Sequence, residues 1–240
     1  MLHKSRGIIL KSTHYSESSL VVHVYTEKFG IQSYLLQGVR KNKSKIRTSM
    51  IQPLHLVQMV VYHKENNGLQ RISELRNEPL LNNLSNDFIK TSLSLFICEL
   101  LYQTLKEQPS DEELFEFLFQ AIELLDLAEE SVANYHLWFM LKYSKYLGFY
   151  PQISSKNQIY FDMKNAAFID AMPEHPIFMN EACSKIMFQL MQSNFNEIQN
   201  IKINNENRKQ LLMDLIRYYE WHLPGFKGLK SHHVLEEVLS

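Results

Sequence analysis

The hydrophobic and polar residues of this 240-residue chain follow two different periods, and the change falls near residue 80. Before it, β-branched and aromatic residues form short runs separated by polar or glycine-containing breaks, which is typical of strands. The five runs cover residues 7–11, 20–25, 31–39, 54–62 and 69–75. Five short strands predict a small closed barrel, most commonly an OB-fold. The strand count alone leaves an SH3-like barrel equally open.

Beyond Pro79, apolar residues recur every three to four positions, which is the period of a helix with one buried face. Segments with this period cover residues 88–107, 110–125, 131–147, 180–192 and 205–221, and a short last helix begins at Ser231. Residues 157–171 interrupt the pattern with two short β-type runs, which predict a small β-hairpin. We therefore expect an α+β chain, with an OB-fold barrel over residues 1–80 and a helical domain with a hairpin insertion over residues 81–240.

The formal charge of −1 conceals opposite charges on the two predicted domains. Residues 1–80 hold 12 basic and 5 acidic side chains, a net +7, whereas residues 81–240 hold 13 and 21, a net −8. A basic domain is suited to a polyanion such as nucleic acid. The hydrophobic share of 45%, with only seven glycines and seven prolines, allows substantial cores and excludes a disordered or fibrous chain.

The cysteine count and the apolar runs bear on the cellular compartment. Two cysteines are too few for a disulfide framework, which indicates a reducing environment. The first residues contain no signal-peptide core. The longest apolar stretch, residues 91–105, is interrupted by polar residues and is shorter than the roughly 20 apolar residues of a membrane span. We expect a cytoplasmic protein with no membrane partner.

Sequence motifs for catalysis and metal binding are missing. The chain contains no G-x-S-x-G, H-E-x-x-H, G-x-G-x-x-G, Walker or C-x-x-C pattern. Ser231, His232 and His233 suggest part of a catalytic triad, but a serine at a helix start followed by two exposed histidines explains them without a placed acid. We predict no catalytic residue, no metal site and no cofactor.

A basic segment between the third and fourth predicted strands is the main candidate for binding. Residues 28–64 contain no Asp or Glu. Five cations lie within eight residues of this segment: Arg40, Lys41, Lys43, Lys45 and Arg47. A cationic loop beside a barrel face can follow a phosphate backbone, releasing counterions and giving salt-sensitive affinity without sequence preference. The alternative is a solvated loop that only aids solubility.

Residues of the predicted strands extend this candidate DNA-binding site. Lys11 and Tyr34 are its predicted members outside the loop, Lys11 as a phosphate contact and Tyr34 as a stacking surface. The alternative for Tyr34, as for the other tyrosines, is a place in the core, where most aromatic residues of a barrel lie. Further contributors of the same two kinds would be Lys4, Arg6, His14, Tyr15 and Tyr25. Residues 107–130, by contrast, carry nine carboxylates and no Lys or Arg, which indicates either a solvated helix face or a docking surface for a basic protein.

Five stretches of the chain carry a family resemblance, at residues 7–19, 25–30, 37–44, 146–151 and 218–231. In this order they resemble the bacterial RecO family of DNA repair proteins. The resemblance implies an amino-terminal OB-fold, a helical carboxy-terminal domain and a non-enzymatic, nucleoid-associated role as a recombination mediator. It also implies binding to single- and double-stranded DNA, strand annealing, cooperation with RecR and single-stranded-DNA-binding protein, and help in loading RecA onto coated DNA.

One departure from the family concerns metal binding. Many members follow the leucine-glycine segment, here Leu147 and Gly148, with paired cysteines that form a zinc site, but residues 152–176 contain no cysteine. We therefore expect a zinc-free variant whose hairpin, residues 159–169, is held by packing.

Two other functional classes remain open from the residues alone. A protein-interaction adaptor would use the barrel to bind an acidic protein or peptide. A nuclease would need a carboxylate cluster for metal ions beside the basic surface, and the scarcity of Asp and Glu before residue 80 disfavours it.

Overall fold

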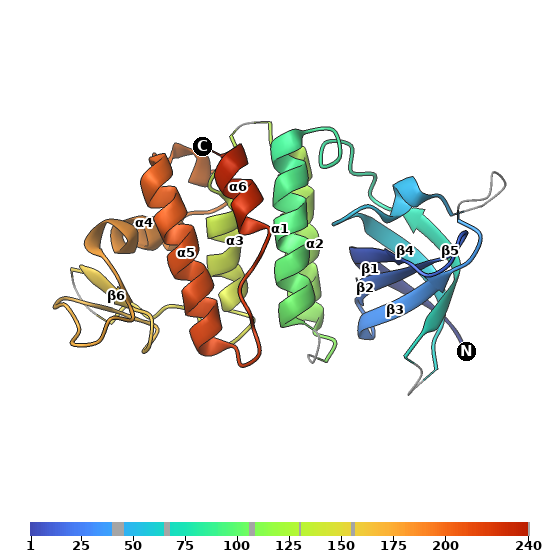
Figure 1. Cartoon of the computed structure of the whole chain (residues 1–240), viewed down its shortest axis with the longest axis horizontal. Coiled ribbons are helices and arrows are strands. Elements are labelled where there is room, and N and C mark those ends of the chain that lie inside the picture. The colour runs from blue at the N-terminus through green and yellow to red at the C-terminus, as the bar shows by residue number, and fades with distance from the viewer. Residues whose placement is uncertain (40–45, 65–67, 106–108, 130, 155–156, 240) are drawn as a thin grey trace. The chain divides into compact units, whose positions relative to one another are not determined.

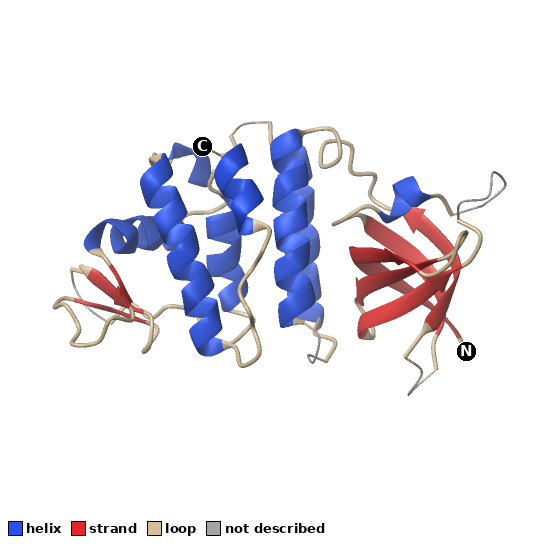
Figure 2. Cartoon of the chain, viewed as in Figure 1, coloured by secondary structure: helices blue, strands red, loops and turns tan. Residues whose placement is uncertain are grey.

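The computed structural model describes residues 1–239 except 40–45, 65–67, 106–108, 130 and 155–156. It divides into two compact units, Met1–Leu127 and Ala128–Ser240. The first unit contains a five-stranded barrel and two long helices, and the second contains the later helices and a small sheet (Figures 1 and 2). The predicted boundary at residue 80 marks the change from strands to helices, whereas the compact units divide after the second long helix.

The barrel consists of β1 (Leu2–His14), β2 (Leu20–Thr26), β3 (Gly30–Leu36), β4 (Leu56–Tyr62) and β5 (Gln70–Asn77). Its closed order is β1-β2-β3-β5-β4. The pairing of β3 with β5 is parallel, and all other pairs are antiparallel. This topology is the OB-fold, so the predicted fold class is confirmed and the SH3-like alternative is not adopted.

Strand β1 is longer than its apolar run, because mainly polar residues continue it at both ends, and those from Lys11 to His14 are exposed. It pairs with β2 along one edge and with β4 along the other, and its register with β2 shifts between Ile9 and Lys11. Gly7 lies where these neighbours come closest. A Cβ atom there would lie 2.6 Å from Val24 Cγ1 and 2.7 Å from Met59 Cε, so only glycine fits without displacing the core.

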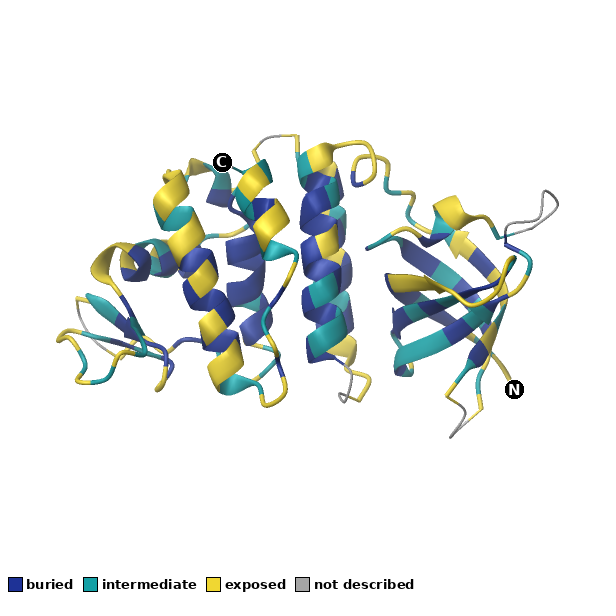
Figure 3. Ribbon diagram, in the orientation of Figure 1, coloured by how far each residue is buried: buried dark blue, intermediate teal, exposed yellow. Residues whose placement is uncertain are grey.

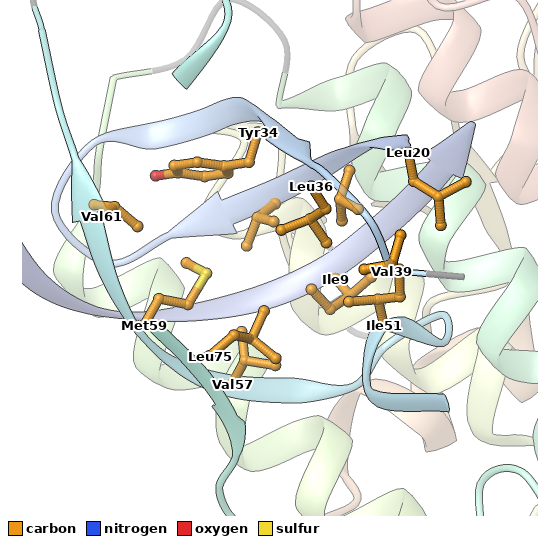
Figure 4. Close-up of a cluster of buried hydrophobic side chains, with 12 residues drawn as sticks. Ile9, Leu20, Tyr34, Leu36, Val39, Ile51, Val57, Met59, Val61 and Leu75 are labelled. Carbon is orange, nitrogen blue, oxygen red and sulfur yellow. The ribbon is translucent and has the colours of Figure 1, made fainter. Parts of the chain in front are cut away.

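Alternate residues of the strands fill the inside of the barrel, as Figure 4 shows for Ile9, Met59 and Val61. The residues that close one end come from the connection between β3 and β4. Val39 and Ile51 are buried in this cluster, and Ile51 ends the 3-10 turn η1 (Thr48–Ile51).

Tyr34 belongs to this core and has no exposed surface. Its ring points into the barrel and offers no face for base stacking in this structure, which differs from its predicted place in the DNA-binding site. Burial raises the pKa of its hydroxyl. The buried oxygen has no hydrogen-bond partner among the described residues.

Helices α1 (Phe88–Thr104) and α2 (Glu112–Leu127) pack against the barrel. Cys98 of α1 directs its sulfur to the carbonyl oxygen of Ile9 at 3.5 Å. Phe115 of α2 lies beside Tyr25 of β2, with the ring centroids 5.9 Å apart. The two helices therefore form one body with the barrel.

A buried carboxylate fixes the connection from β5 to α1. Asp126, near the end of α2, accepts hydrogen bonds from the backbone N–H groups of Asn82, Asn83 and Leu84 at 3.2, 2.7 and 2.8 Å. The ammonium group of Lys90 donates to the carbonyl oxygen of Asp126 at 2.8 Å. These bonds satisfy polar groups that burial would otherwise leave unpaired.

The second unit contains α3 (Tyr135–Ser144), α4 (Glu181–Gln192), α5 (Asn205–His222), α6 (His232–Val238) and the 3-10 turn η2 (Ile198–Asn200). Helix α3 is buried on nearly all sides and forms the centre of this unit (Figure 3). Phe149 joins two of the family-like stretches, because its carbonyl oxygen accepts from the Tyr218 hydroxyl and its ring stacks on His222 at 5.2 Å.

The predicted hairpin is present as β6 (Tyr160–Asp162) and β7 (Ala167–Ile169), and a third strand, β8 (Phe178–Met179), pairs with β6. Its turn depends on Asp162, which is largely buried. The carboxylate accepts from the backbone N–H groups of Lys164 and Asn165 at 2.9 and 3.1 Å and from the Asn165 side chain at 2.7 Å. His175 Nε2 lies 3.4 Å from it. Hydrogen bonds thus supplement apolar packing in this sheet.

We expect Tyr34→Phe to raise the free energy of unfolding, because it removes a buried hydroxyl without a partner while keeping the ring. The expected gain is about 1 kcal/mol, measured by urea denaturation. DNA affinity should stay unchanged, since the ring faces the core. A drop in stability of similar size would show that the hydroxyl has a bonding partner.

The Asp162 carboxylate should make the stability of the second unit depend on pH. Burial acts to raise its pKa, but hydrogen bonds from Asn165 and Lys164 and the charge of His175 outweigh this and lower it. The charged form therefore stabilises the fold above the ordinary pKa of about 4, and this contribution is lost as pH falls through the lowered value.

We expect Asp162→Asn to lower the free energy of unfolding by about 2 kcal/mol at pH 7. The difference in the free energy of unfolding between the variant and the unmodified protein should shrink progressively below about pH 4. Thermal or urea unfolding at several pH values would measure it. Asp170→Asn removes the same charge from an exposed position close by and serves as the control. Equal effects of the two substitutions at every pH would contradict the role given to Asp162.

Candidate nucleic-acid interface

The residues that flank most of the predicted basic loop pack on the barrel core. Arg40, Lys41, Lys43 and Lys45 lie outside the described residues, so their positions stay predictions. Val39 and Ile46, on either side of them, pack against the barrel cluster. Arg47 is exposed and directly precedes η1. The segment that carries four of the five cations therefore lies between two residues that pack on the barrel, and Arg47 directly follows the second of them.

Strand register places Lys11 near that same end. His14, Leu20 and Leu36 are successive partners across β1, β2 and β3, and Leu36 is the last residue of β3 before the basic connection. Lys11 lies three residues before His14 and its side chain is exposed. The Lys11 ammonium group lies 5.2 Å from the centre of the Tyr102 ring. Strand register thus brings the end of β1 beside the end of β3, and the joining of Lys11 with the loop cations in one site stays a prediction.

The tyrosines of the predicted site divide into buried and exposed residues. Tyr25 is fully buried, and its hydroxyl points to the carbonyl oxygen of Asp111 at 3.5 Å. Burial, together with the charge of Asp111, raises the pKa of Tyr25 to about 12. Tyr15, in the β1–β2 loop, is 64% exposed. Tyr15 is therefore the member of this set that can stack on a base at the loop end of the barrel.

Arg6 has a structural role that the sequence analysis missed. Its guanidinium donates to Glu27 at 3.0 Å and to Glu116 of α2. It also lies 5.1 Å from the ring centres of both Phe115 and Phe119. Hydrogen bonds to the two carboxylates raise the pKa of Arg6. Arg6 therefore fastens α2 to the barrel and contributes little charge to a ligand.

The acidic stretch is partly used within the protein. Glu116 pairs with Arg6, Asp126 holds the β5–α1 connection, and Asp111 accepts from the backbone N–H of Leu114 at 3.0 Å at the start of α2. Residues 81–127 carry 2 basic and 9 acidic side chains, a net −7, whereas residues 128–240 carry 11 and 12. The negative charge of the helical half is therefore concentrated in the helices that pack on the basic barrel.

A second basic surface, which the sequence analysis did not find, lies on the outer face of β1, β4 and β5. It contains a hollow of about 510 Å³. The charged residues that line the hollow are Lys4, Arg6, Glu27, Lys28, Glu74 and Arg76. The signal in the sequence is the alternation of charged residues along β1 and β5, as in Lys4 and Arg6 of β1.

Within the described ranges, no group of three or more His, Cys, Asp or Glu side chains is arranged to hold a metal ion. In the same part of the chain, no helix is both long enough and apolar enough to cross a membrane.

Comparison with known proteins agrees with the two-part architecture. Residues 1–77 match the family model "Recombination protein O N terminal", and residues 85–233 match "Recombination protein O C terminal". The chain is 35% identical over 239 residues to a DNA repair protein RecO of Azobacteroides pseudotrichonymphae, covering 99% of both chains. It is 34% identical to that of Phocaeicola vulgatus over the full length of both, and 33% identical to that of Flavobacterium psychrophilum over 99% of both. The family resemblance of the five stretches is thereby confirmed, and the chain belongs to the RecO family.

Proposed function

We propose that this protein is a DNA-binding recombination mediator that acts in recombinational DNA repair. It anneals complementary strands and, with RecR, helps to load RecA onto single strands coated by single-stranded-DNA-binding protein. The observation that carries the proposal is the basic connection between β3 and β4, anchored to an OB-fold barrel by Val39 and Ile46. The names of the relatives, all DNA repair proteins, agree with it.

The mechanism is electrostatic and makes or breaks no covalent bond. Arg40, Lys41, Lys43, Lys45 and Arg47, with Lys11, bind the phosphates of one strand and release its condensed counterions. Neutralising part of the phosphate charge lowers the repulsion that a complementary strand meets on approach. Tyr15, which is exposed after the end of β1, supplies a stacking face for a base.

The acidic helices keep the bound strand on the barrel. Residues 81–127 carry a net charge of −7 and repel phosphates. Because Glu116 is bound to Arg6, these helices are fixed to the barrel and limit the strand to the barrel surface that they leave open. RecR and single-stranded-DNA-binding protein are partners by family membership, and we assign them no binding residues.

Replacing Arg40, Lys41, Lys43, Lys45 and Arg47 together with Ala should weaken DNA binding at least about tenfold at physiological salt. The slope of log K against log salt should flatten by about 0.7 for each phosphate of a single strand that the variant no longer neutralises. Fluorescence anisotropy with a labelled oligonucleotide at several salt concentrations measures both quantities.

The control replaces five exposed cations of the second unit, Lys185, Lys202, Lys209, Lys227 and Lys230, with Ala. It should leave the affinity and the slope unchanged. If the loop variant keeps the full affinity and slope, the site is wrongly assigned. If the unmodified protein shows no saturable DNA binding at physiological salt, an adaptor that binds acidic proteins becomes the better interpretation.

Because the proposed mechanism uses only protein side chains, removal of metal ions should not affect it. Treating the protein with EDTA and dialysing it should leave the rate of strand annealing, followed by fluorescence resonance energy transfer at fixed ionic strength, within about twofold. Cleavage of the labelled strands on addition of Mg²⁺ would instead indicate a nuclease.

A further inference from the structure

The outer face of β1, β4 and β5 is built from three rows of side chains set by strand register. Across the three strands, the rows are Leu2, Tyr62 and Arg71; Lys4, Val60 and Glu74; and Arg6, Gln58 and Arg76. Tyr62 is 48% exposed and directly faces Arg71 on the neighbouring strand. The face therefore combines cations with an aromatic ring that solvent can reach.

The hollow on this face is open to a ligand. Arg6 forms its border with the helices, because the same side chain lines the hollow and pairs with Glu116 of α2. The turn between β2 and β3 contributes Glu27 and Lys28 to the wall. A volume of about 510 Å³ is enough to receive a nucleotide-sized group.

The cations of this face are largely available. Lys4, Lys28 and Arg71 are exposed, and none of them makes an ion pair among the described residues. Arg76 pairs with Glu78 at 2.8 Å, but the two side chains are 67% and 47% exposed. An exposed pair of this kind exchanges readily for a phosphate, since water already weakens it. With Arg6 bound to Glu27 and Glu116, the three rows hold the cations Lys4, Arg71 and Arg76 against the single carboxylate of Glu74, so positive charge exceeds negative charge on them.

The face is separate from the loop site. Lys4 and Lys11 lie seven residues apart on β1, which corresponds to roughly 23 Å along a strand. The loop ends pack near the carboxyl end of β1, whereas the rows described above lie along its amino half. Two DNA strands can therefore occupy the barrel at the same time without competing for the same cations.

We propose that this outer face binds the sugar-phosphate backbone of a second single strand while the basic loop holds the first. Lys4, Lys28, Arg71 and Arg76 bind its phosphates, and Tyr62 stacks on a base. The inference rests on the proposed function, because the outer face would bind the second of the two strands that the protein anneals. In this arrangement a single barrel holds both strands, and a second protein molecule is not needed to bring them together.

The first test separates binding from annealing. Replacing Lys4, Lys28, Arg71 and Arg76 with Gln should leave the affinity for a first labelled oligonucleotide within about twofold and slow annealing of complementary strands at least about tenfold. Replacing Lys185, Lys202, Lys209 and Lys230 with Gln removes the same charge from exposed positions of the second unit and should leave annealing unchanged.

The second test uses the unmodified protein, so it does not depend on how the variant folds. Lysines are acetylated in the presence of an unlabelled oligothymidylate, and mass spectrometry measures the extent at each site. The loop lysines Lys41, Lys43 and Lys45 should be protected by the first equivalent of strand. Lys4 and Lys28 should be protected only when a second equivalent is added.

The outcomes distinguish this inference from the proposed function. If the loop lysines stay reactive and no DNA is bound, the proposed function fails. If the loop lysines are protected but Lys4 and Lys28 stay reactive with excess strand, and the outer-face variant anneals at the normal rate, the second site is overturned while the mediator role stands. Protection of Lys4 and Lys28 by polyglutamate but not by DNA would also overturn it, and would indicate an acidic peptide as the occupant.

Discussion

The barrel is closed because each of its five strands pairs with a neighbour along both edges. Strand β1, the longest of them, pairs with β2 along one edge and with β4 along the other. Its centre tolerates only glycine, since Gly7 faces Val24 and Met59 at distances that exclude a side chain. Arg6 and Gly7 are consecutive, so the anchor of α2 and the tight packing around Gly7 both depend on the placement of a single strand.

Charge balance in the first unit is the second constraint. The barrel carries +7 and the helices packed on it carry −7, and the link between them is Arg6, held by two carboxylates and two aromatic rings. The electrostatic field of this unit is therefore strongly polarised rather than uniformly positive. A polyanion meets an attractive surface on one side and a repulsive one on the other, which restricts how it can lie.

Much of the architecture follows from local pattern. Each signal can be recognised in a short stretch of sequence. The change of period near residue 80 and the turn residues predict the strands and helices, and the charge of residues 40–47 predicts the basic loop. What the pattern could not settle is the orientation of residues in β3, where polar and apolar side chains occur on both faces. Tyr34 was therefore open to interpretation as a surface residue, although it fills the core.

Other features depend on partners far apart in the chain. Arg6 and Glu116 are 110 residues apart, and nothing in either neighbourhood indicates the pair. The outer face of β1, β4 and β5 requires the register of three strands before Lys4, Tyr62 and Arg71 are seen to lie together. The periodic pattern of a strand shows which of its side chains lie on the same face. Only the pairing of neighbouring strands shows which side chains of different strands lie together on one face of the sheet.

The carboxylate of Asp126 has a consequence for the dynamics of the chain. Asn83 and Leu84 lie in a connection without regular secondary structure, yet their N–H groups are bonded to a buried acceptor on α2. Breaking those bonds requires the end of α2 to separate from the connection, so their exchange with solvent deuterium reports that separation rather than fraying of the connection alone. In hydrogen exchange, the segment that joins barrel and helices in sequence is thus coupled to the last turn of α2.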